Sequence, residues 1–225
     1  MNVISMCLFG AEPKYCVGAV KNAHLAKTFY PGWEMVVYLG KGVPQKTQDD
    51  LRKAGVVLYM SPLNPMIARF LICDNLSYER FIVRDTDSRF NKRESDAVQQ
   101  WIESDRAFHI IRDHPGHGVC IGGGLWGAKT GAVQMLKLID AWKGNKEPGP
   151  RLNIYNQDQM FLRDMVWPVA RKDSLQHDLC YRHVFRDAVP FPASFDDPRF
   201  VGEVFDENDK PDPFHWQMRL NYMSR

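Results

Sequence analysis

Two carboxylates one residue apart follow a short apolar run in the stretch RFIVRDTDSRF. Residues 81–83 predict a buried strand, and because alternate side chains of an extended segment point the same way, Asp85 and Asp87 can converge on one point. At about 5 Å they repel by about 3 kcal/mol at an effective dielectric constant near 20, a penalty that a divalent cation removes. Oxygen ligands suit Mg²⁺ or Mn²⁺. A solvated polar turn, with Arg84 and Arg89 as counter-ions, explains the same residues equally well.

Three other stretches carry residues that suit a ligand site. They are IARFL at 67–71, CIGGGLWGAK at 120–129 and NQDQMFL at 156–162. The first places Arg69 on a predicted helix, the second lets a ligand approach backbone N–H groups, and the third puts an acid and an amide at a helix start. Each is a weak signal alone, since three glycines usually form a turn and an Asp-Gln pair commonly caps a helix.

The stretch FHIIRDHPGHG at 108–118 follows a predicted strand with four more polar residues. We expect Arg112 and Asp113 to contact a bound ligand at this edge of the sheet. His114 and His117 could form a metal pair, but Pro115-Gly116 between them precludes helical spacing. A capped loop without a ligand remains the third interpretation.

The elements that must position these residues begin as strand, helix, strand, helix, strand over the first sixty residues. NVISMCLFG, GWEMVVYLG and VVLYM are short and apolar, and the segments between them have helical spacing, with Pro44 at a helix start and Gly55 at its stop. This rhythm predicts a parallel sheet with helical crossovers. Helices are expected next at 64–76, 93–104, 131–143 and 156–167, with strands at 80–85 and 107–113. In such sheets ligands bind beyond the carboxyl ends of the strands, which is where the aspartates lie.

Composition excludes several classes of protein. The 225 residues are 44% hydrophobic and 25% charged, and 29 Lys and Arg against 27 Asp and Glu argue against nucleic-acid binding. No apolar run approaches the roughly 18–20 residues that span a bilayer, so no transmembrane segment is expected, and the first residues do not resemble a secretory signal. Five cysteines without a CxxC pair indicate reduced thiols in a cytoplasmic protein and argue against a zinc site.

The order of these stretches resembles that of the GT-A glycosyltransferases, and within them the small family-8-type enzymes of surface-glycan synthesis. An A-R-x-x-L helix is followed by a strand with D-x-D, a glycine-bearing strand, a helix, and D-Q opening a further helix. The likeness covers about residues 1–165 and is specific at RDTDS and NQDQMFL. It implies an α/β fold with a mixed, mainly parallel Rossmann-like sheet flanked by helices. It also implies one domain over 1–225, with a nucleotide-binding half at 1–120 and an acceptor half with an irregular tail at 121–225.

The resemblance further implies a nucleotide-diphosphate-sugar donor, most often UDP-linked, with Mn²⁺ or Mg²⁺ bridging the two aspartates and the diphosphate. Asp158 and Gln159 would lie at the reacting centre, and a late histidine, His177 with His183 and His215 as rivals, would be a third metal ligand. The donor contacts expected are Leu8, Phe9, Gly10, Arg69, Arg84, Asp85, Thr86, Asp87, Arg112, Asp113, Gly122, Gly123 and Gly124.

The expected activity is the transfer of one hexosyl or deoxyhexosyl group to a hydroxyl of a glycan acceptor. Asp158 would serve as the base in an inverting reaction, whereas the leaving phosphate could take the proton in a retaining one. Two alternatives stay open. A phosphatase-like hydrolase also uses D-x-D at a strand end, although its pair follows the first strand, and a non-catalytic protein that binds nucleotide sugars could share the whole pattern.

Overall fold

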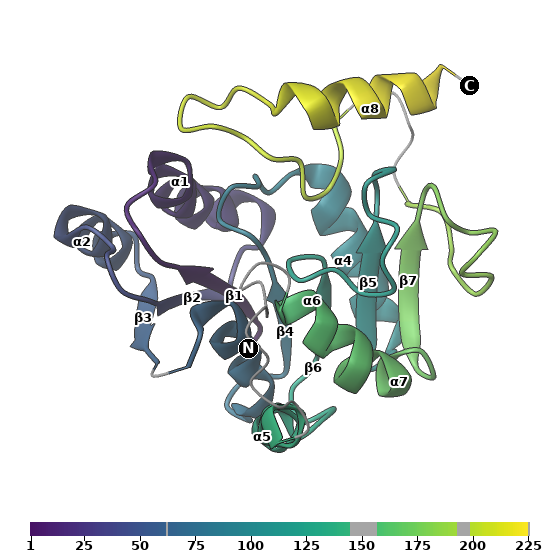
Figure 1. Cartoon of the computed structure of the whole chain (residues 1–225), viewed down its shortest axis with the longest axis horizontal. Coiled ribbons are helices and arrows are strands. Elements are labelled where there is room, and N and C mark those ends of the chain that lie inside the picture. The colour runs from purple at the N-terminus through teal and green to yellow at the C-terminus, as the bar shows by residue number, and fades with distance from the viewer. Residues whose placement is uncertain (62, 145–156, 193–198, 225) are drawn as a thin grey trace.

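Seven strands form one mixed sheet with helices on both faces (Figure 1). The computed structural model describes residues 1–61, 63–144, 157–192 and 199–224. The strand order is β3-β2-β1-β4-β6-β5-β7, and β6 runs antiparallel to both of its neighbours while all other pairs are parallel. The strands are β1 Val3–Leu8, β2 Glu34–Leu39, β3 Val57–Met60, β4 Arg80–Val83, β5 Phe108–Arg112, β6 Trp126–Lys129 and β7 Ser174–Asp178. The predicted mixed, mainly parallel sheet is confirmed.

The alternating start of the chain folds as its periodicity predicts. Helix α1 (Pro13–Phe29) joins β1 to β2, and α2 (Gln45–Lys53) joins β2 to β3. Pro13 occupies the first turn of α1, where a missing N–H costs nothing. Because each helix crosses back over the sheet, β1, β2 and β3 are parallel. Strand β4 is also parallel to β1, so the carboxyl ends of β1, β2 and β4 lie side by side at one edge of the sheet.

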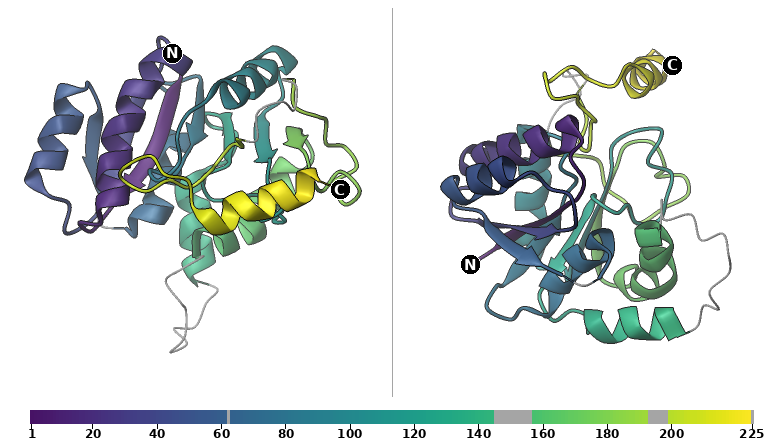
Figure 2. Two further views of the ribbon diagram at one scale, coloured as in Figure 1. Left: turned by 90° about the horizontal axis from the view of Figure 1, so that it is seen from above. Right: turned by 60° about the vertical axis from the view of Figure 1, so that its left-hand side comes forward.

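Each face of the sheet has its own apolar layer. Along β1, Val3 and Cys7 pack on one face and Ile4 and Met6 on the other, as the period of two requires. The first layer is closed by α3 (Pro65–Ala68), α5 (Met135–Gly144) and α6 (Gln157–Phe161), and the second by α1, α2 and α4 (Lys92–Ser104) (Figures 1 and 2). All residues of β4 are buried, and after Arg80 the strand is apolar to its carboxyl end.

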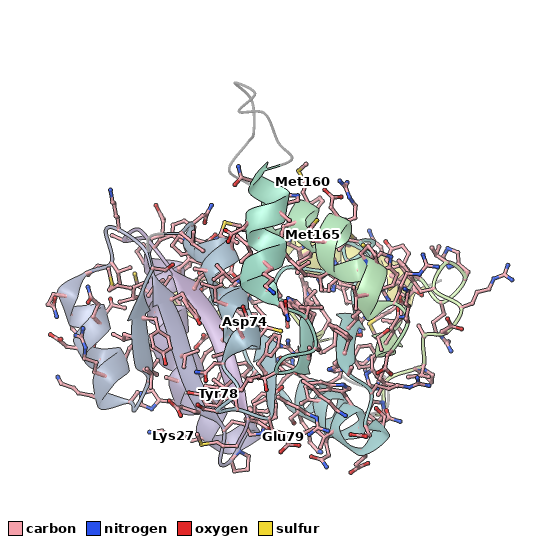
Figure 3. The ribbon with its side chains drawn as sticks, turned by 90° about the horizontal axis from the view of Figure 1, so that it is seen from below. Lys27, Asp74, Tyr78, Glu79, Met160 and Met165 are labelled. Atoms are coloured by element: carbon pink, nitrogen blue, oxygen red, sulfur yellow. The ribbon has the colours of Figure 1, made fainter. Side chains whose placement is uncertain are left out.

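The predicted helix at 64–76 begins as α3 and continues as a 3₁₀ helix, η1 (Arg69–Asp74). The tighter turn ends at Asp74, whose carboxylate accepts the backbone N–H groups of Met135 and Leu136 at 2.7 and 2.8 Å. Asp74 thus fixes the start of α5, beside which it lies in Figure 3.

The sequence predicts that the helix carrying Asp158 ends before Pro168, but the structure shows that it continues past this proline. Helix α6 passes into a π-helix, η2 (Leu162–Val166), and then into α7 (Trp167–Ala170). Proline lacks the N–H of a regular helical bond, and the wider π turn before it lets the chain continue. Residue 156, at the predicted start, lies outside the described residues.

The last forty residues are more regular than expected. Helix α8 (Pro213–Met223) follows the Asp212 cap, whose side chain accepts the N–H groups of Phe214 and His215 at 3.0 Å. Helix α8 runs across the side of the molecule where β4 and β5 end (Figures 1 and 2), and Arg219 donates there to the carbonyl of Asp113 at 2.9 Å. Phe200 and Phe205 are buried and anchor this segment.

Within the described part of the chain, no helix is both long and apolar enough to cross a membrane.

Candidate functional site

The aspartate loop (residues 85–88) leaves β4 at the carboxyl edge of the sheet and is fixed by hydrogen bonds. The hydroxyl of Ser88 donates to the carbonyl of Asp85 at 2.8 Å, and the Asn22 amide of α1 donates to the carbonyl of Ser88 at 2.8 Å. Gly18 lets α1 approach this closely, because a Cβ at that position would overlap the carbonyl oxygen of Thr86. The loop is therefore held in one conformation by the helix that follows β1.

The C-terminal segment holds the same loop from the other side. The backbone N–H of Phe205 donates to the carbonyl of Asp87 at 2.9 Å. The buried guanidinium of Arg89 donates to Asp209 at 2.9 Å and to the carbonyl of Asp206 at 3.1 Å. Only the fold brings these residues together, since nothing in the sequence connects positions 120 residues apart.

The two aspartates of the loop differ in environment. The side chain of Asp85 is 50% exposed, whereas Asp87 is almost fully buried. Burial and the neighbouring charge of Asp85 raise the pKa of Asp87 to about 6, and Lys14, 3.6 Å away, offsets part of that shift. A buried carboxylate repelled by its neighbour is the electrostatic setting that a divalent cation relieves.

Arg69 connects the aspartate loop with the Asp-Gln pair. Its guanidinium is buried in η1 and donates to Asp85 at 2.5 Å and to Asp158 at 2.8 Å. Asp158 is also buried, and burial raises the pKa of its carboxyl despite the arginine. The backbone N–H of Gln159 donates to the Asp158 carboxylate at 2.9 Å, so the start of the helix orients Asp158. Residues from three distant stretches thus meet at one point.

The predicted glycines lie against this cluster in the turn that precedes β6, rather than in the strand itself. A Cβ on Gly123 would overlap the carboxylate of Asp158 and come within 2.9 Å of Arg69, and one on Gly124 would overlap Asp85. Backbone therefore approaches both carboxylates where only glycine leaves room.

We expect Gly124→Ala to weaken divalent-cation binding at least ten-fold, because the new methyl group displaces the Asp85 carboxylate. Calorimetric titration with Mn²⁺ measures the change. Gly122→Ala is the matched control, since the nearest atoms to its Cβ would belong to the side chain of Leu125, at 3.3 Å. Equal affinities for the two variants would show that Asp85 does not bind the cation.

The end of β1 contributes residues at the same edge. Leu8 is buried in the core, whereas Phe9 is 48% exposed and Gly10 has φ +70°, a conformation that favours glycine. The N–H of Gly10 donates to the carbonyl of Lys41 at 2.8 Å. Phe9 and Gly10 are therefore the accessible part of the predicted Leu8-Phe9-Gly10 stretch.

Arg84 points into the molecule, not toward the aspartates. Its guanidinium forms a buried ion pair with Glu94 at 2.6 Å and donates to the carbonyls of Val83 and Trp126 at 2.7 and 3.0 Å. Alternation along β4 directs residue 84 away from its neighbours at 83 and 85. Arg84 ties β4 to α4 and β6 and is not among the residues that we assign to the donor site.

Arg112 and Asp113 also have internal partners. Arg112 is buried, donates to Gln176 at 3.0 Å and to Asp178 at 3.3 Å, and lies 3.5 Å from the ring centre of Phe185. Asp113 is buried and receives the N–H groups of Arg93 at 2.7 and 2.8 Å. Both residues are held by partners within the chain, and the donor contacts expected of them stay a prediction.

His177 is not brought to the aspartates. It lies in β7, three strands from β4, a separation of about 14 Å at the usual strand spacing. Its ring nitrogens are within 2.8 Å of His109 and of the Gln100 side chain, and the residue is fully buried. His177 therefore belongs to the core and is not available as a third ligand.

This histidine predicts a pH-dependent stability. Burial, with the charge of Arg93, lowers the pKa of His177 to about 4, against about 6.5 in an unfolded chain. Between pH 4 and pH 6.5 the unfolded chain binds one more proton at this residue than the folded chain does. The free energy of unfolding therefore decreases as the pH is lowered from about 6.5 to 4, and the contribution of His177 to this decrease is about 2 kcal/mol at pH 5. Urea unfolding at pH 8 and pH 5 measures the loss. A His177→Gln variant with an undiminished difference would contradict the assignment.

The structure adds Lys14, which the sequence analysis did not single out. It stands in the first turn of α1 beside Asp87. The signal available in the sequence was a lysine directly after the proline that opens a helix, just beyond the first strand.

A surface depression of about 480 Å³, lined by residues that include Lys27 and Trp33, lies at the amino ends of the strands, on the side seen in Figure 3. None of the predicted site residues lines it.

The carboxylates of the site suit a cation that is coordinated jointly by the protein and a bound ligand, rather than one coordinated by protein side chains alone. Among the residues that the structure describes, no group of three or more His, Cys, Asp or Glu is arranged to hold a metal. Two carboxylates at the sheet edge, with glycine backbone beside Asp85, match the way Mg²⁺ is bound by one or two carboxylates together with substrate phosphates. The residues present therefore fit a divalent cation.

No known protein family and no curated protein matches the sequence. Among solved structures, the chain is similar to a glycosyltransferase involved in glycosylation of the major capsid of PBCV-1, with 15% identity over 79% of this chain and 81% of that one and a TM-score of 0.50. Other matches are the mannosyltransferase PcManGT from Pyrobaculum calidifontis with GDP-Man and Mn²⁺ (12% identity, 79% and 54% coverage, TM-score 0.49) and the galactosyltransferase LgtC with donor and acceptor analogues (14%, 79% and 73%, 0.44). The sheet and the first match show the fold of GT-A nucleotide-sugar transferases.

Proposed function

We propose that this protein is a metal-dependent glycosyltransferase that moves one sugar from a nucleotide-diphosphate donor to a hydroxyl of a glycan acceptor. The observation that carries the proposal is the cluster of Asp85, Arg69 and Asp158, which joins the aspartate loop to the Asp-Gln pair through one buried arginine. A loop that is capped for structural reasons alone needs no arginine that connects two acids 73 positions apart in sequence. It also needs no neighbouring turn in which glycine leaves room for both carboxylates.

Asp85 and Asp87 would hold the cation, which we propose to be Mn²⁺ or Mg²⁺. When bound, it would neutralise charge that develops on the leaving diphosphate as a Lewis acid. Thr86, between the aspartates, and the accessible Phe9 and Gly10 would border the nucleotide, for which a UDP-linked donor is the proposal. Gly122, Gly123 and Gly124 would border the donor sugar.

The reaction breaks the bond between the anomeric carbon and a diphosphate oxygen and forms a bond from that carbon to the acceptor oxygen. Arg69 holds Asp158 in place and contributes positive charge beside the leaving group. Asp158, whose pKa is raised by burial, would accept the hydroxyl proton if the enzyme inverts configuration. In a retaining enzyme that proton would pass to the leaving phosphate, with Asp158 and Gln159 stabilising the positively charged sugar.

The proposal also covers the transferred sugar, the cellular location and the domain organisation. The transferred group would be a hexosyl or deoxyhexosyl residue, and the protein would act in the cytoplasm. The whole chain would be one domain, with residues 1–120 binding the nucleotide and 121–225 facing the acceptor.

Thermal-shift measurement with UDP-, GDP- and dTDP-sugars, each with and without Mn²⁺, tests the proposal. We expect stabilisation by at least one donor that depends on the cation and is lost in Asp85→Ala and Asp87→Ala. Stabilisation that persists in both variants would exclude the cation site. Phosphatase activity without nucleotide preference would favour a hydrolase instead.

A further inference from the structure

We propose that Lys14 is a donor-binding residue that pairs with Asp87 when no divalent cation is bound and with the donor diphosphate when the cation occupies the two aspartates. The inference rests on the proposed function, because it assigns a further residue to the same donor site.

The position of Lys14 is set by the packing of α1 against the aspartate loop. Lys14 and Gly18 lie four residues apart on one face of α1. At Gly18 the helix packs so closely on the loop that a Cβ would overlap the carbonyl oxygen of Thr86, and the helix turn before it therefore passes beside the aspartates. Asn22, another turn along the same face, donates to the carbonyl of Ser88. Lys14 is therefore held at the loop by three successive turns.

Each aspartate of the pair already has a cationic side chain beside it. Arg69 contacts Asp85 at 2.5 Å, and Lys14 lies 3.6 Å from Asp87. The two cationic side chains differ in burial, because Arg69 is buried and contacts two carboxylates, whereas the side chain of Lys14 is 38% exposed. A flexible, partly exposed ammonium group can leave its partner more readily than a buried guanidinium.

A divalent cation at Asp87 repels Lys14 and competes with it for the carboxylate. The displaced ammonium group remains on the first turn of α1, beyond the carboxyl end of β1, where nucleotide ligands of this kind of sheet bind. A diphosphate bound to the cation brings negative charge to the same place. The released lysine then acquires a new anionic partner without any movement of the backbone.

This exchange has a signature that a merely structural ion pair lacks. Removing the lysine charge should strengthen binding of the cation alone, because a competitor is lost, and weaken binding of the nucleotide, because a phosphate contact is lost. An ordinary partly exposed ion pair contributes little to either.

The experiment is calorimetric titration of Lys14→Met, first with Mn²⁺ alone and then with UDP or GDP at saturating Mn²⁺. We expect Mn²⁺ to bind on the order of five-fold more tightly and the nucleoside diphosphate on the order of ten-fold more weakly than to the wild type. Lys14→Arg should restore both values to near those of the wild type. Lys27→Met, at the far end of the same helix, is the matched control and should change neither.

If Lys14→Met leaves both affinities unchanged, or lowers both in parallel, the exchange is wrong while the proposed function stands. If the wild type binds neither Mn²⁺ nor the nucleoside diphosphates, both are overturned together. Circular dichroism of each variant shows whether the fold is retained, and Lys14→Arg keeps the comparison valid should the methionine variant unfold.

Discussion

Asp87→Asn is expected to lower the rate of sugar transfer by about 10²–10³-fold while leaving the fold at least as stable as that of the wild type. The loss of activity follows because an amide is a poorer ligand for a hard divalent cation and cannot supply its negative charge. The stability follows because burial and the charge of Asp85 disfavour the ionised carboxylate of Asp87, so its removal relieves repulsion. Steady-state transfer rates and thermal unfolding on the same samples measure both.

Asp85→Asn should lose activity to a similar extent but without the gain in stability, because Asp85 is paired with Arg69. Asp49→Asn, on the exposed surface of α2, is the control and should leave transfer unchanged. If Asp87→Asn transfers sugar at the wild-type rate, the aspartate loop is a polar turn and nothing more.

Arg69→Ala should destabilise the protein by about 3–5 kcal/mol and abolish detectable transfer. The substitution leaves the buried carboxylate of Asp158 without its partner and frees Asp85 to move. Urea unfolding measures the free-energy change. Arg106→Ala is the contrast, since its pair with Asp173 is exposed at both ends and should contribute less than about 1 kcal/mol.

The double variant Arg69→Ala with Asp158→Asn shows whether the two residues act together. Because the asparagine removes the stranded charge, the pair should be less destabilising than the sum of the single changes. Additive effects, or a loss below about 1 kcal/mol for Arg69→Ala alone, would contradict the role of Arg69 as the connection between the two acids.

The sequence predicts the first half of the fold well because its elements follow strong local rules. The apolar runs of β1, β2 and β4 and the helix signals around α1 and α2 agree with their final environment. The same reasoning about strand ends predicts that Asp85 and Asp87 lie at the carboxyl edge of the sheet, which is where β4 ends.

The elements that escaped prediction lack such local signals or override them. Strand β7 has the sequence SLQHD, whose polar residues are buried only because β5 and α4 supply partners for them. Helix α8 has no continuous apolar face, and its one buried residue is Arg219. Its start did carry a signal, Asp212 followed by Pro213, which the many prolines of the tail obscured.

Side-chain partners were beyond what spacing alone can predict. The sequence places Arg84 and Asp113 directly after predicted strands, at the edge where ligands bind. In the structure, however, both side chains form buried ion pairs with residues of α4, Arg84 with Glu94 and Asp113 with Arg93. Such pairs depend on which helix packs over which strand. Arg69 shows the converse case, because its connection with both acids needed the fold to become visible.

The measurement that tests the central claim most directly is the release of nucleoside diphosphate from a panel of UDP-, GDP- and dTDP-sugars, with Mn²⁺ and with a chelator. The proposed function predicts release from at least one donor that requires the cation, increases with a glycan acceptor and disappears in Asp87→Asn. Absence of release from every donor with Mn²⁺ and acceptor present, or release of equal rate in the chelator, would contradict it.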